Sequence, residues 1–488
     1  MTLRICTLIL LAAAAPVFAA DQVTFTKDVL PILQENCQDC HRPGGANLGG
    51  MVAPMAFSTY QETRPWAKAI ARAVTTRTMP PWDAAPEFAG HFSNERSLTQ
   101  VQIDILVAWV EGGAQRGNPS DAPAPRVFDD SGEWTIGVPD LVVQMPEAYF
   151  VDDDVEDIYV NFYDELSAEE LPEDRYIKAV EFRPGSAAVH HIISNPLGGI
   201  APGNDATVYP EGYATKLRKG TKVSFEMHYH KEAGPNTGMW DQSSAAIKLY
   251  PEGYVPEHEI RMAPLMNVSF EIPAGAEHYV EHASESFDRD VQILSYTPHM
   301  HLRGKYARYD ATYPDGKSET LLEVPQYDFN WQTTYWHNEP KVLPKGSSVD
   351  LTMAWDNSPA NAYNPDPTKN VRFGEPTTDE MFFGFMNYAY VEEPRGVSVD
   401  ASILERYVGQ YKLQGDMPML VTIGLQDGKL TAAIMGQDPT PLMTESATRF
   451  SLSDFGLVIT FELDDIGDAV KGANFRLLGN ETMGLPVQ

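Results

Sequence analysis

The sequence is short of cysteine, of basic residues and of long hydrophobic runs. Three cysteines in 488 residues cannot form a disulfide-stapled scaffold. Lys and Arg total 36 against 68 Asp and Glu, a net charge of −32, so the chain lacks the basic face that binds nucleic-acid phosphates. Its one long apolar run is N-terminal, so we expect no transmembrane helix in the mature chain. The apolar content of 43% is ordinary for a globular protein, and the length predicts three or four domains.

The N-terminal run has the features of a secretory signal peptide over residues 1–19. A positive charge precedes an apolar stretch, and small residues stand before a cleavage site after Ala19. We therefore expect a periplasmic protein. Cys6 leaves with the signal, and Cys37 and Cys40 are too close together for a disulfide between them to close a useful loop. The two remaining cysteines are therefore expected to serve chemistry.

The pattern of apolar residues changes along the mature chain. Before a Pro-rich linker at 116–133 the pattern is helical, and Thr99 and Gln102 form a capping box that predicts a helix ending at Gly112. After the linker the pattern has period two, as in Val223–Tyr229, which predicts a β-sandwich up to about residue 395. The last 90 or so residues contain a hairpin signal and predict a further β unit.

The segment Cys37-Gln38-Asp39-Cys40-His41 has the C-x-x-C-H pattern of covalent haem attachment. Two thiols at this spacing can form thioethers with the haem vinyl groups, and the adjacent His41 can bind the iron. A zinc site would need a second C-x-x-C pair, and a thioredoxin-like site would need a surrounding βαβ pattern. The sequence has neither, so we predict one covalently attached haem c.

The sixth iron ligand is expected beyond this motif. Met79 is followed by two prolines that stiffen its loop, and a thioether raises the potential of an electron-transfer haem. Met51 and Met55 are the alternatives. With its helices, C-x-x-C-H motif and Met-Pro loop, the segment 22–115 resembles class I c-type cytochromes.

Nine of the twelve histidines lie between residues 190 and 301. They include three clusters: His190-His191, His228-Tyr229-His230 and His299-Met300-His301. Residues i and i+2 of a strand lie on one face, about 6.6 Å apart, so His299 and His301 can converge on one metal ion. Adjacent strand residues such as His190 and His191 face opposite ways, and a bulge or strand end is needed for them to converge. Imidazole suits copper, zinc, iron or nickel, and a thioether ligand favours copper.

Four ordered motifs carry a family resemblance. They are Val189-His190-His191-Ile192, Met227-His228-Tyr229, His299-x-His301-Leu302-x-Gly304-Lys305 and Asp379-Glu380-Met381. Over about residues 134–392 the chain resembles the copper type II, ascorbate-dependent monooxygenases, which include peptidylglycine α-hydroxylating monooxygenase and dopamine β-monooxygenase. The resemblance implies two jelly-roll domains, each with one copper ion. The electron-transfer copper would be bound by His190, His191 and His228, and the oxygen-activating copper by His299, His301 and Met381.

The chain departs from this family at several positions. His230 shares a face with His228 and has no family role; it is either a surface residue, a neighbour of the ligands, or the ligand in place of His228. Family members that amidate peptides hold the substrate carboxylate through positions that are Thr297, Phe383 and Phe385 here. The chain therefore lacks the partners that a peptidylglycine carboxylate needs, and an apolar or aromatic small molecule is expected as the substrate. The disulfides of the eukaryotic members cannot form in this chain.

Residues 402–488 resemble a lipocalin-like β domain that follows many bacterial serine hydrolases. The resemblance depends on three short motifs: Tyr407–Tyr411, Asp427–Leu430 and Thr448–Phe450. None of them carries a catalytic constellation. The expected role of this region is structural or in interaction.

Together these observations predict a fold class and a function. The expected fold class is multidomain, with an all-α cytochrome c domain at 20–115, jelly-roll β-sandwich copper domains at 134–255 and 256–395, and a small lipocalin-like β domain at 402–488. The expected function is hydroxylation of a substrate C–H bond with O2, with electrons from an ascorbate-like reductant or a periplasmic redox protein passing through the haem. The alternative is a haem- and copper-containing electron-transfer or copper-binding protein without oxygenase activity.

Overall fold

A computed structural model describes residues 22–45, 53–128, 133–414, 419–434, 439–452, 457–464, 469–477 and 480–487. The predicted signal peptide and Met51 lie outside these residues. The chain divides into two compact units. The described part of the helical unit comprises 22–45, 53–80 and 98–128, and the β unit holds the segment 81–97 and the described residues from 133 onward.

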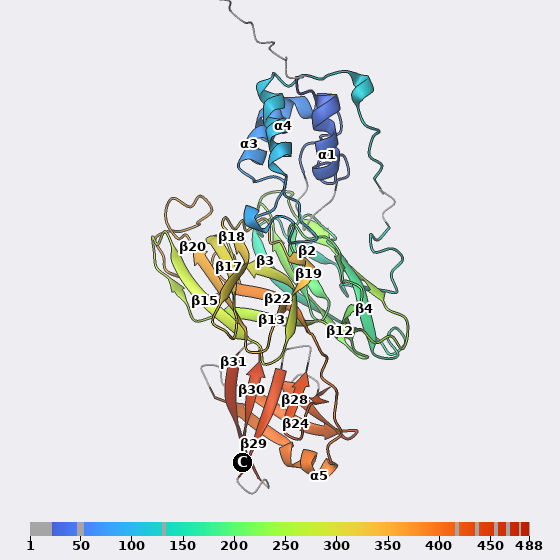
Figure 1. Ribbon diagram of the computed structural model, residues 1–488, viewed down its shortest axis with the longest axis vertical. Coiled ribbons are helices and arrows are strands. Elements are labelled where there is room, and N and C mark those ends of the chain that lie inside the picture. The colour runs from blue at the N-terminus through green and yellow to red at the C-terminus, as the bar shows by residue number, and fades with distance from the viewer. Residues whose placement is uncertain are drawn as a thin grey trace, which may run out of the picture. The chain divides into compact units, whose positions relative to one another are not determined.

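The helical unit contains short helices around one small core. They are η1 (Phe25–Val29, a π-helical turn), α1 (Leu30–Asn36), α2 (Tyr60–Thr63), η2 (Arg64–Trp66), α3 (Ala67–Thr75), α4 (Gln100–Glu111) and η4 (Pro119–Asp121), labelled in part in Figure 1. The predicted capping box is present at the start of α4, where Thr99 accepts from the Gln102 backbone N–H, and Gly112 is the C-cap. Trp109 of α4 is fully buried against Phe25, with ring centroids 5.9 Å apart.

The fold class predicted from the sequence is wrong. Among the described residues, strands hold far more of the chain than helices do, and no large all-α domain is present. The longest helix, α4, has 12 residues, and the next longest, α3, has 9. The capping signals correctly predicted where α4 starts and ends, but irregular chain joins these helices instead of further helical turns.

The segment Pro81–Ser97 is one place where the predicted all-α domain was wrong. It lies within the predicted all-α region, yet it belongs to the β unit, where it contributes the single turn η3 (Pro86–Phe88). Trp82 is buried and its ring centroid lies 5.0 Å from that of Tyr335. The backbone N–H of Ala85 donates to the carbonyl of Glu323 at 2.8 Å. Prolines and glycine prevent a regular helix here, and the aromatic side chains are buried against strands instead.

The first β region of the β unit extends to residue 259. Its strands are β1 (Leu141–Gln144), β2 (Tyr149–Val151), β3 (Asp157–Glu165), β4 (Arg175–Arg183), β5 (Val189–Ser194), β6 (Gly198–Ile200), β7 (Thr207–Val208), β8 (Tyr213–Leu217), β9 (Lys222–His230), β10 (Met239–Asp241), β11 (Ser244–Leu249) and β12 (His258–Glu259). One sheet has the order β1-β11-β4-β8-β12 with β7 beside β4, another has the order β3-β9-β5-β6, and β2 pairs with β10. The alternation predicted for Val223–Tyr229 is confirmed in β9 up to Met227, and beyond it His228 and Tyr229 are both fully buried because both faces of the strand are covered there.

The second β region follows directly. Its strands are β13 (Arg261–Asn267), β14 (Glu271–Ile272), β15 (Tyr279–Ser286), β16 (Val291–His299), β17 (Gly304–Thr312), β18 (Ser318–Val324), β19 (Tyr335–Leu343), β20 (Ser348–Trp355), β21 (Val371–Arg372) and β22 (Phe382–Tyr390). The main sheets have the orders β13-β22-β16-β19 and β15-β20-β17-β18, and β14 pairs with β21. In the first of these sheets β22 lies antiparallel to β16, with Phe383 opposite His299.

The C-terminal region is one antiparallel sheet of nine strands. After α5 (Ala401–Leu404) and η5 (Glu405–Tyr407) come β23 (Gly409–Leu413), β24 (Leu420–Gln426), β25 (Lys429–Ile434), β26 (Thr440–Pro441), β27 (Met443–Thr444), β28 (Arg449–Leu452), β29 (Leu457–Leu463), β30 (Val470–Leu477) and β31 (Asn480–Pro486). The sheet order is β26-β25-β24-β23-β31-β30-β29-β28-β27. The predicted hairpin is confirmed, because β24 and β25 pair around Asp427 and Gly428, both of which have positive φ.

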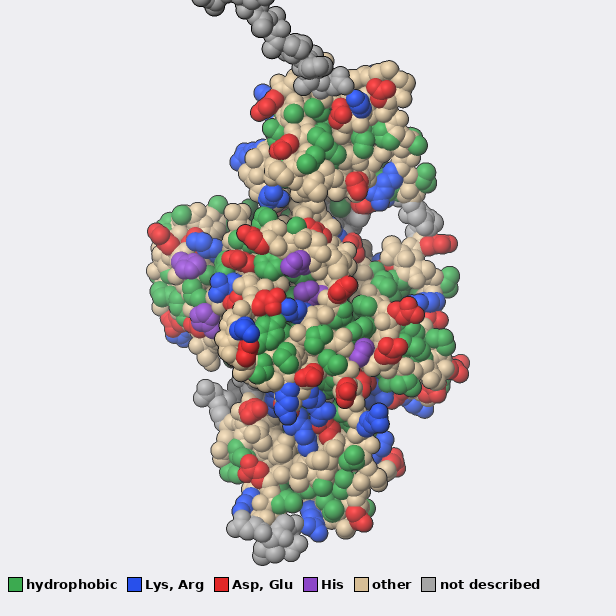
Figure 2. All heavy atoms as spheres, in the orientation of Figure 1, with side chains coloured by type: hydrophobic (Ala, Val, Ile, Leu, Met, Phe, Trp, Pro, Cys, Tyr) green, Lys and Arg blue, Asp and Glu red, His purple; other side chains and the backbone are tan. Residues whose placement is uncertain are grey.

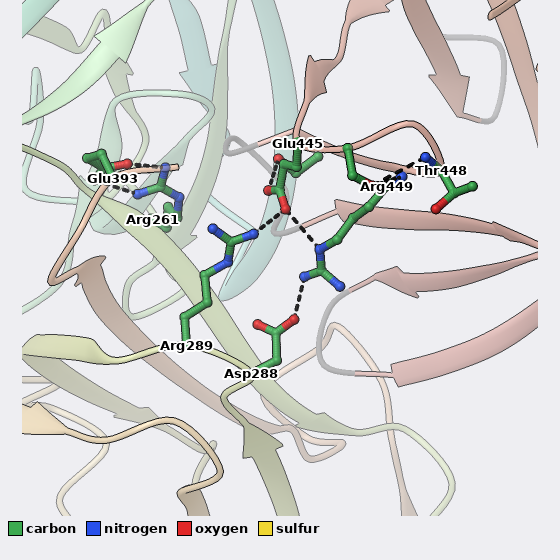
Figure 3. Close-up of polar contacts among 9 residues, drawn as sticks. Arg261, Asp288, Arg289, Glu393, Glu445, Thr448 and Arg449 are labelled. Atoms are coloured by element: carbon green, nitrogen blue, oxygen red, sulfur yellow. Dashed lines mark hydrogen bonds and ion pairs between the residues drawn. The ribbon is translucent and has the colours of Figure 1, made fainter. Parts of the chain in front are cut away.

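Arginines join this sheet to the second β region, and Figure 2 shows Lys and Arg side chains gathered along the junction. Arg289 and Arg449 both point at the carboxylate of Glu445, as Figure 3 shows. Arg449 also pairs with Asp288, while Arg476 pairs with Glu285. The side chain of Glu445 is nearly buried, and burying a carboxylate is costly unless its charge is paired. The two guanidinium groups provide that pairing.

Within the described residues, no helix is long and apolar enough to cross a membrane.

Candidate metal centre

The first histidine set, His190, His191 and His228, comes from β5 and β9. Adjacent residues in a regular strand would point to opposite faces, but β5 has a register shift between Val189 and His191. A bulge of this kind re-aims side chains, so both histidines can take part in one cluster. Across the strand pair His191 lies opposite His228. The chain thus has the irregularity that convergence of His190 and His191 requires.

The Nδ1 atoms of the first set face one another. Those of His190 and His191 are 3.3 Å apart, and those of His191 and His228 are also 3.3 Å apart. Each histidine offers a nitrogen within 4.8 Å of the others, and all three side chains are buried. Imidazole nitrogens about 2.0–2.1 Å from a metal in tetrahedral geometry lie about 3.3 Å apart. The observed spacing therefore fits three ligands of one ion.

Burial keeps these imidazoles neutral. It lowers the pKa of His190 and of His191 well below the usual histidine value, and the neighbouring His228 lowers both further. Burial also lowers the pKa of His228, although the carboxylate of Asp157 opposes that shift. A metal binds the neutral form of imidazole, so a ligand with a low pKa needs no deprotonation at neutral pH.

Asp157, at the start of β3, fixes the tautomer of His228. One carboxylate oxygen lies 2.7 Å from His228 Nε2. Burial alone would raise the pKa of Asp157, but hydrogen bonds from His228 and Thr377 lower it to about 2. An ionised carboxylate only accepts hydrogen bonds, so Nε2 carries the proton and Nδ1 presents its lone pair to the cluster. Tyr159 stacks on the His228 ring with centroids 4.2 Å apart.

His190 and His230 complete the surroundings of the first set. The ring of His190 stacks on Phe329 with centroids 4.5 Å apart, and its Nε2 is buried without a hydrogen-bond partner among the described residues. The Nδ1 of His230 is likewise buried and without a described partner. His230 could hold a metal together with Asp157 and His228, so its role stays open between ligand and neighbour.

The second set comprises His299, His301 and Met381. Its two histidines have Nε2 free, whereas the histidines of the first set face one another through Nδ1. His299 Nδ1 lies 2.7 Å from Oε1 of Gln332, whose amide nitrogen donates to the Phe329 carbonyl. His301 Nδ1 lies 3.3 Å from the Asp379 carbonyl. Both partners are acceptors, so each Nδ1 carries the proton and each Nε2 keeps its lone pair.

Burial dominates the titration of this second pair. It lowers the pKa of His299 to about 4 and that of His301 to about 3. His301 is fully buried, and its Nε2 has no hydrogen-bond partner among the described residues. A buried lone pair without a donor costs free energy unless something binds it. The His301 nitrogen therefore fits a metal ligand.

Met381 directly follows a segment that is hydrogen-bonded to this pair. The antiparallel pairing of β16 with β22 ends where His299 is opposite Phe383, and Met381 is the residue before β22. The preceding residue, Glu380, accepts from the backbone N–H of His301 at 2.9 Å and is fully buried. Met381 itself is only 9% exposed. The thioether thus belongs to the segment that is hydrogen-bonded to His301.

The two sets are neighbours. The ring centroids of His191 and His299 are 5.8 Å apart, although their strands belong to different β regions. Phe329 stacks on His190 and lies 6.2 Å from the centroid of His301. The half-buried ring of Phe383 stacks on His299, at 6.4 Å between centroids. The sets therefore form one histidine cluster with aromatic side chains at its edge.

The C-x-x-C-H motif lies in the helical unit, in the turn that follows α1. Cys37 is the C-cap of α1, and neither Cys37 nor Cys40 is in a disulfide. Burial raises the pKa of Cys37 to about 12. His41 Nδ1 lies 3.1 Å from the carbonyl of Met55, and its ring stacks on Phe57 at 4.4 Å. With Nδ1 bound to an acceptor, Nε2 keeps the lone pair that an iron ligand needs, so the motif fits haem.

The candidates for the sixth iron ligand are less constrained. Met79 is half-buried, one residue before the end of the segment 53–80 of the helical unit. Among the described residues, no hydrogen bond joins its side chain to His41. Met55 is half-buried and packs against the core of the helical unit. Met79 remains a prediction from its sequence context.

Four residues of the cluster were missed by sequence reasoning: Asp157, Tyr159, Phe329 and Gln332. Each acts on a histidine that is distant in the sequence; Asp157, for example, is 71 residues from His228. None lies in a motif of its own, so only strand pairing brings them to the site. Glu380 was within a quoted motif, but its role as the acceptor of the His301 N–H could not be seen there.

Comparisons with known proteins do not assign this chain to a family. No family model matches it, and no curated protein matches it. A solved structure that it is similar to is the Cowpea mosaic virus top component, described as naturally occurring empty particles, at 9% identity over 49% of this chain and 79% of that chain. The TM-score is 0.21, which is too low to support any conclusion about fold or function.

Proposed function

We propose that the chain is a periplasmic copper-dependent monooxygenase that inserts one atom of O2 into a C–H bond of a small apolar or aromatic molecule. The observation that supports this most is the split of the histidines into a first set facing through Nδ1 and a second set offering Nε2, where the residue before Met381 is hydrogen-bonded to His301. Two copper ions are proposed, one held by each set. Three imidazoles suit an electron-transfer copper, and a thioether suits Cu(I).

Bound copper would supply the activation of O2 and two electrons, and the chain's own residues would do the rest. The overall change is substrate C–H plus O2, two electrons and two protons, giving the alcohol and water. Gln332 and Asp379 hold the second-set rings, and Asp157 holds His228. Such partners fix ring orientation and tune the ligands of a metal site.

Aromatic residues beside His299 support an apolar substrate. Phe383 lies between Phe385 and Phe373, with ring centroids 6.0 Å and 5.7 Å away, and all three rings are only half-buried. None of these side chains can pair with a substrate carboxylate. An aromatic molecule could stack on them and reach the second set. Thr297, the other position that departs from the peptide-amidating pattern, hydrogen-bonds to Thr334 instead.

The activity is tested by oxygen labelling. Copper-loaded, pre-reduced protein is supplied with a panel of aromatic hydrocarbons under ¹⁸O2, with Met381→Leu protein as the matched control. One labelled oxygen atom per product molecule, formed in step with O2 consumption, is expected of the unmodified protein only. Two bound copper ions with rapid electron exchange but no labelled product from any substrate would favour an electron-transfer protein.

The haem is proposed as the entry point for electrons from an ascorbate-like reductant or a periplasmic redox protein. Protein purified from the periplasm is expected to keep its Soret band after acid–acetone extraction, since thioethers are covalent. In a Cys40→Ala variant the haem should become extractable. Haem that washes out of the unmodified protein would remove this part of the proposal.

A further inference from the structure

One carboxylate contacts both halves of the histidine cluster. The Oδ1 atom of Asp157 lies 2.7 Å from His228 Nε2 in the first set. Its Oδ2 atom accepts a hydrogen bond from the backbone N–H of Thr377 at 3.2 Å and another from the Thr377 hydroxyl. Thr377 is 220 residues further along the chain, in the second β region, and is only 2% exposed.

Thr377 begins the segment that holds the second set. Two residues later, the carbonyl of Asp379 lies 3.3 Å from His301 Nδ1. The next residue, Glu380, accepts from the backbone N–H groups of His301 and Arg303, at 2.9 Å and 2.6 Å. Met381 follows directly. A continuous path of hydrogen bonds and peptide links therefore runs from His228 through Asp157 and Thr377 to His301.

We infer that Asp157 is a positioning residue for both metal-binding sets. It holds His228 with Nε2 protonated and Nδ1 directed at the other two histidines, and it anchors the segment 377–381 against His301. This inference rests on the proposed function only in taking the two sets as copper ligands. The tautomer of His228 and the anchoring of Thr377 are properties of the protein without metal.

The chemistry of the carboxylate explains why this residue type is needed. Asp157 accepts on both oxygens, from a ring N–H on one side and from a hydroxyl and a backbone N–H on the other. An amide has only one acceptor end, and its NH2 group cannot accept from either neighbour. Asp157→Asn would therefore leave either the ring N–H of His228 or the backbone N–H of Thr377 without its acceptor. A carboxylate also raises the basicity of the imidazole it holds, which strengthens a metal ligand.

Two variants and a control separate the two links. Asp157→Asn disturbs both, whereas Thr377→Val removes only the hydroxyl and keeps the side-chain volume close to that of threonine. Asp164→Asn is the matched control, because Asp164 lies on the same strand and accepts from the backbone of its neighbour Glu165. Circular dichroism and the haem Soret band establish that each full-length variant is folded.

Copper binding is the first readout, measured by competition with chelators for Cu(I) and by electron paramagnetic resonance for Cu(II). Asp157→Asn is expected to weaken copper at the first set about 10–100-fold and to change its Cu(II) spectrum. Thr377→Val should leave the first-set spectrum unchanged and weaken Cu(I) at the second set. Asp164→Asn should match the unmodified protein. Unchanged copper affinity at both sets in Asp157→Asn, or loss confined to the first set in Thr377→Val, would overturn the inference.

The tautomer of His228 is the second readout and needs no metal. Metal-free protein labelled with ¹⁵N-histidine should show one ring in the Nε2–H form that is lost in His228→Ala and shifted in Asp157→Asn. If this holds but no copper binds, the positioning role stands and the proposed function fails. If copper binds at both sets but the His228 signal is the same in Asp157→Asn, the positioning role fails and the proposed function stands.

Discussion

The two histidine sets lie side by side but are built in opposite ways. In the first set the Nδ1 atoms of His190, His191 and His228 face one another at 3.3 Å between neighbours. In the second set the Nδ1 atoms of His299 and His301 are bound to protein oxygens, so Nε2 is the free nitrogen. The first offers imidazole only, and the second is hydrogen-bonded to Asp379 and Glu380, the residues directly before the thioether of Met381. One cluster therefore contains two chemically different donor sets.

The difference between the two sets shows two ways in which a β-sheet protein can position metal-binding side chains. The first set depends on a bulge in β5 and on direct pairing with β9, so it is built within one small sheet. The second depends on the end of β16, and on the segment 377–381, of which Thr377, Glu380 and Met381 are buried. Asp157 and Phe329 contact both sets or their holders. We therefore expect the two sets to bind their metal ions separately, although the same residues support both.

The largest expected effect is loss of one whole metal ion from the first set. His228→Ala should bind one copper instead of two, because it removes one of three converging nitrogens. His230→Ala is the matched control on the same strand and should keep both ions. Elemental analysis of copper-loaded protein measures the ratio. Two coppers in His228→Ala with one in His230→Ala would make His230 the ligand.

The next effect is confined to the second set. Met381→Leu conserves volume and should cost less than about 1.5 kcal/mol of stability. It should leave the haem and the first-set copper intact, bind Cu(I) poorly at the second set, and lose substrate-coupled O2 use. Met386→Leu makes the same change in the buried core of β22 and should keep turnover. Full turnover with an unchanged Cu(I) spectrum in Met381→Leu would remove Met381 from the site.

A smaller effect is expected when a ligand loses its holder. Gln332→Leu removes the acceptor from His299 Nδ1 and should weaken copper at the second set about 10–100-fold, with the first set unaffected. Gln292→Leu, on β16 but bonded to Tyr213, is the control and should leave both affinities unchanged. Chelator competition measures both constants. Equal weakening at the two sets would mean that they are not separable.

The last effect, which concerns folding and not metal binding, is a dependence of stability on pH in the metal-free protein. His299 and His301 have pKa values of about 4 and about 3 when folded, against roughly 6.5 when unfolded. Below pH 6.5 the unfolded chain binds protons that the folded chain does not, so stability present above that pH is lost as pH falls toward 4. Each histidine contributes a slope of about 1.4 kcal/mol per pH unit in that range. Urea unfolding at pH 7, 6 and 5 should show a shallower slope in a His299→Asn, His301→Asn double variant; identical slopes would show that neither imidazole is buried neutral.

Local signals in the sequence were sufficient for individual elements. The Thr99 capping box predicted the start of α4, the alternation in Val223–Tyr229 predicted β9, and Asp427-Gly428 predicted the β24–β25 turn. Each of these depends on residues within one element. The histidine doublets were also visible, and so was the need for a bulge at His190-His191.

The parts of the fold and of the site that depend on contacts between distant residues could not be predicted from the sequence. The segment Pro81–Ser97 has no helical pattern, yet nothing near it in the sequence reveals that Trp82 is buried against Tyr335, about 250 residues away, so the all-α domain was wrongly extended across it. Asp157 and Gln332 hold histidines through hydrogen bonds that exist only after the strands pair. Asp and Gln are common on strand surfaces, so the sequence does not distinguish these two residues from others of their type.

Diffraction from crystals of copper-loaded protein, with anomalous data on both sides of the copper edge, tests the two-set arrangement most directly. We expect two copper ions, one within bonding distance of Nδ1 of His190, His191 and His228, and one bound by Nε2 of His299 and His301 with Met381 beside it. A single copper shared between the sets, or copper bound to the first set through Nε2, would contradict the division of this cluster into two donor sets.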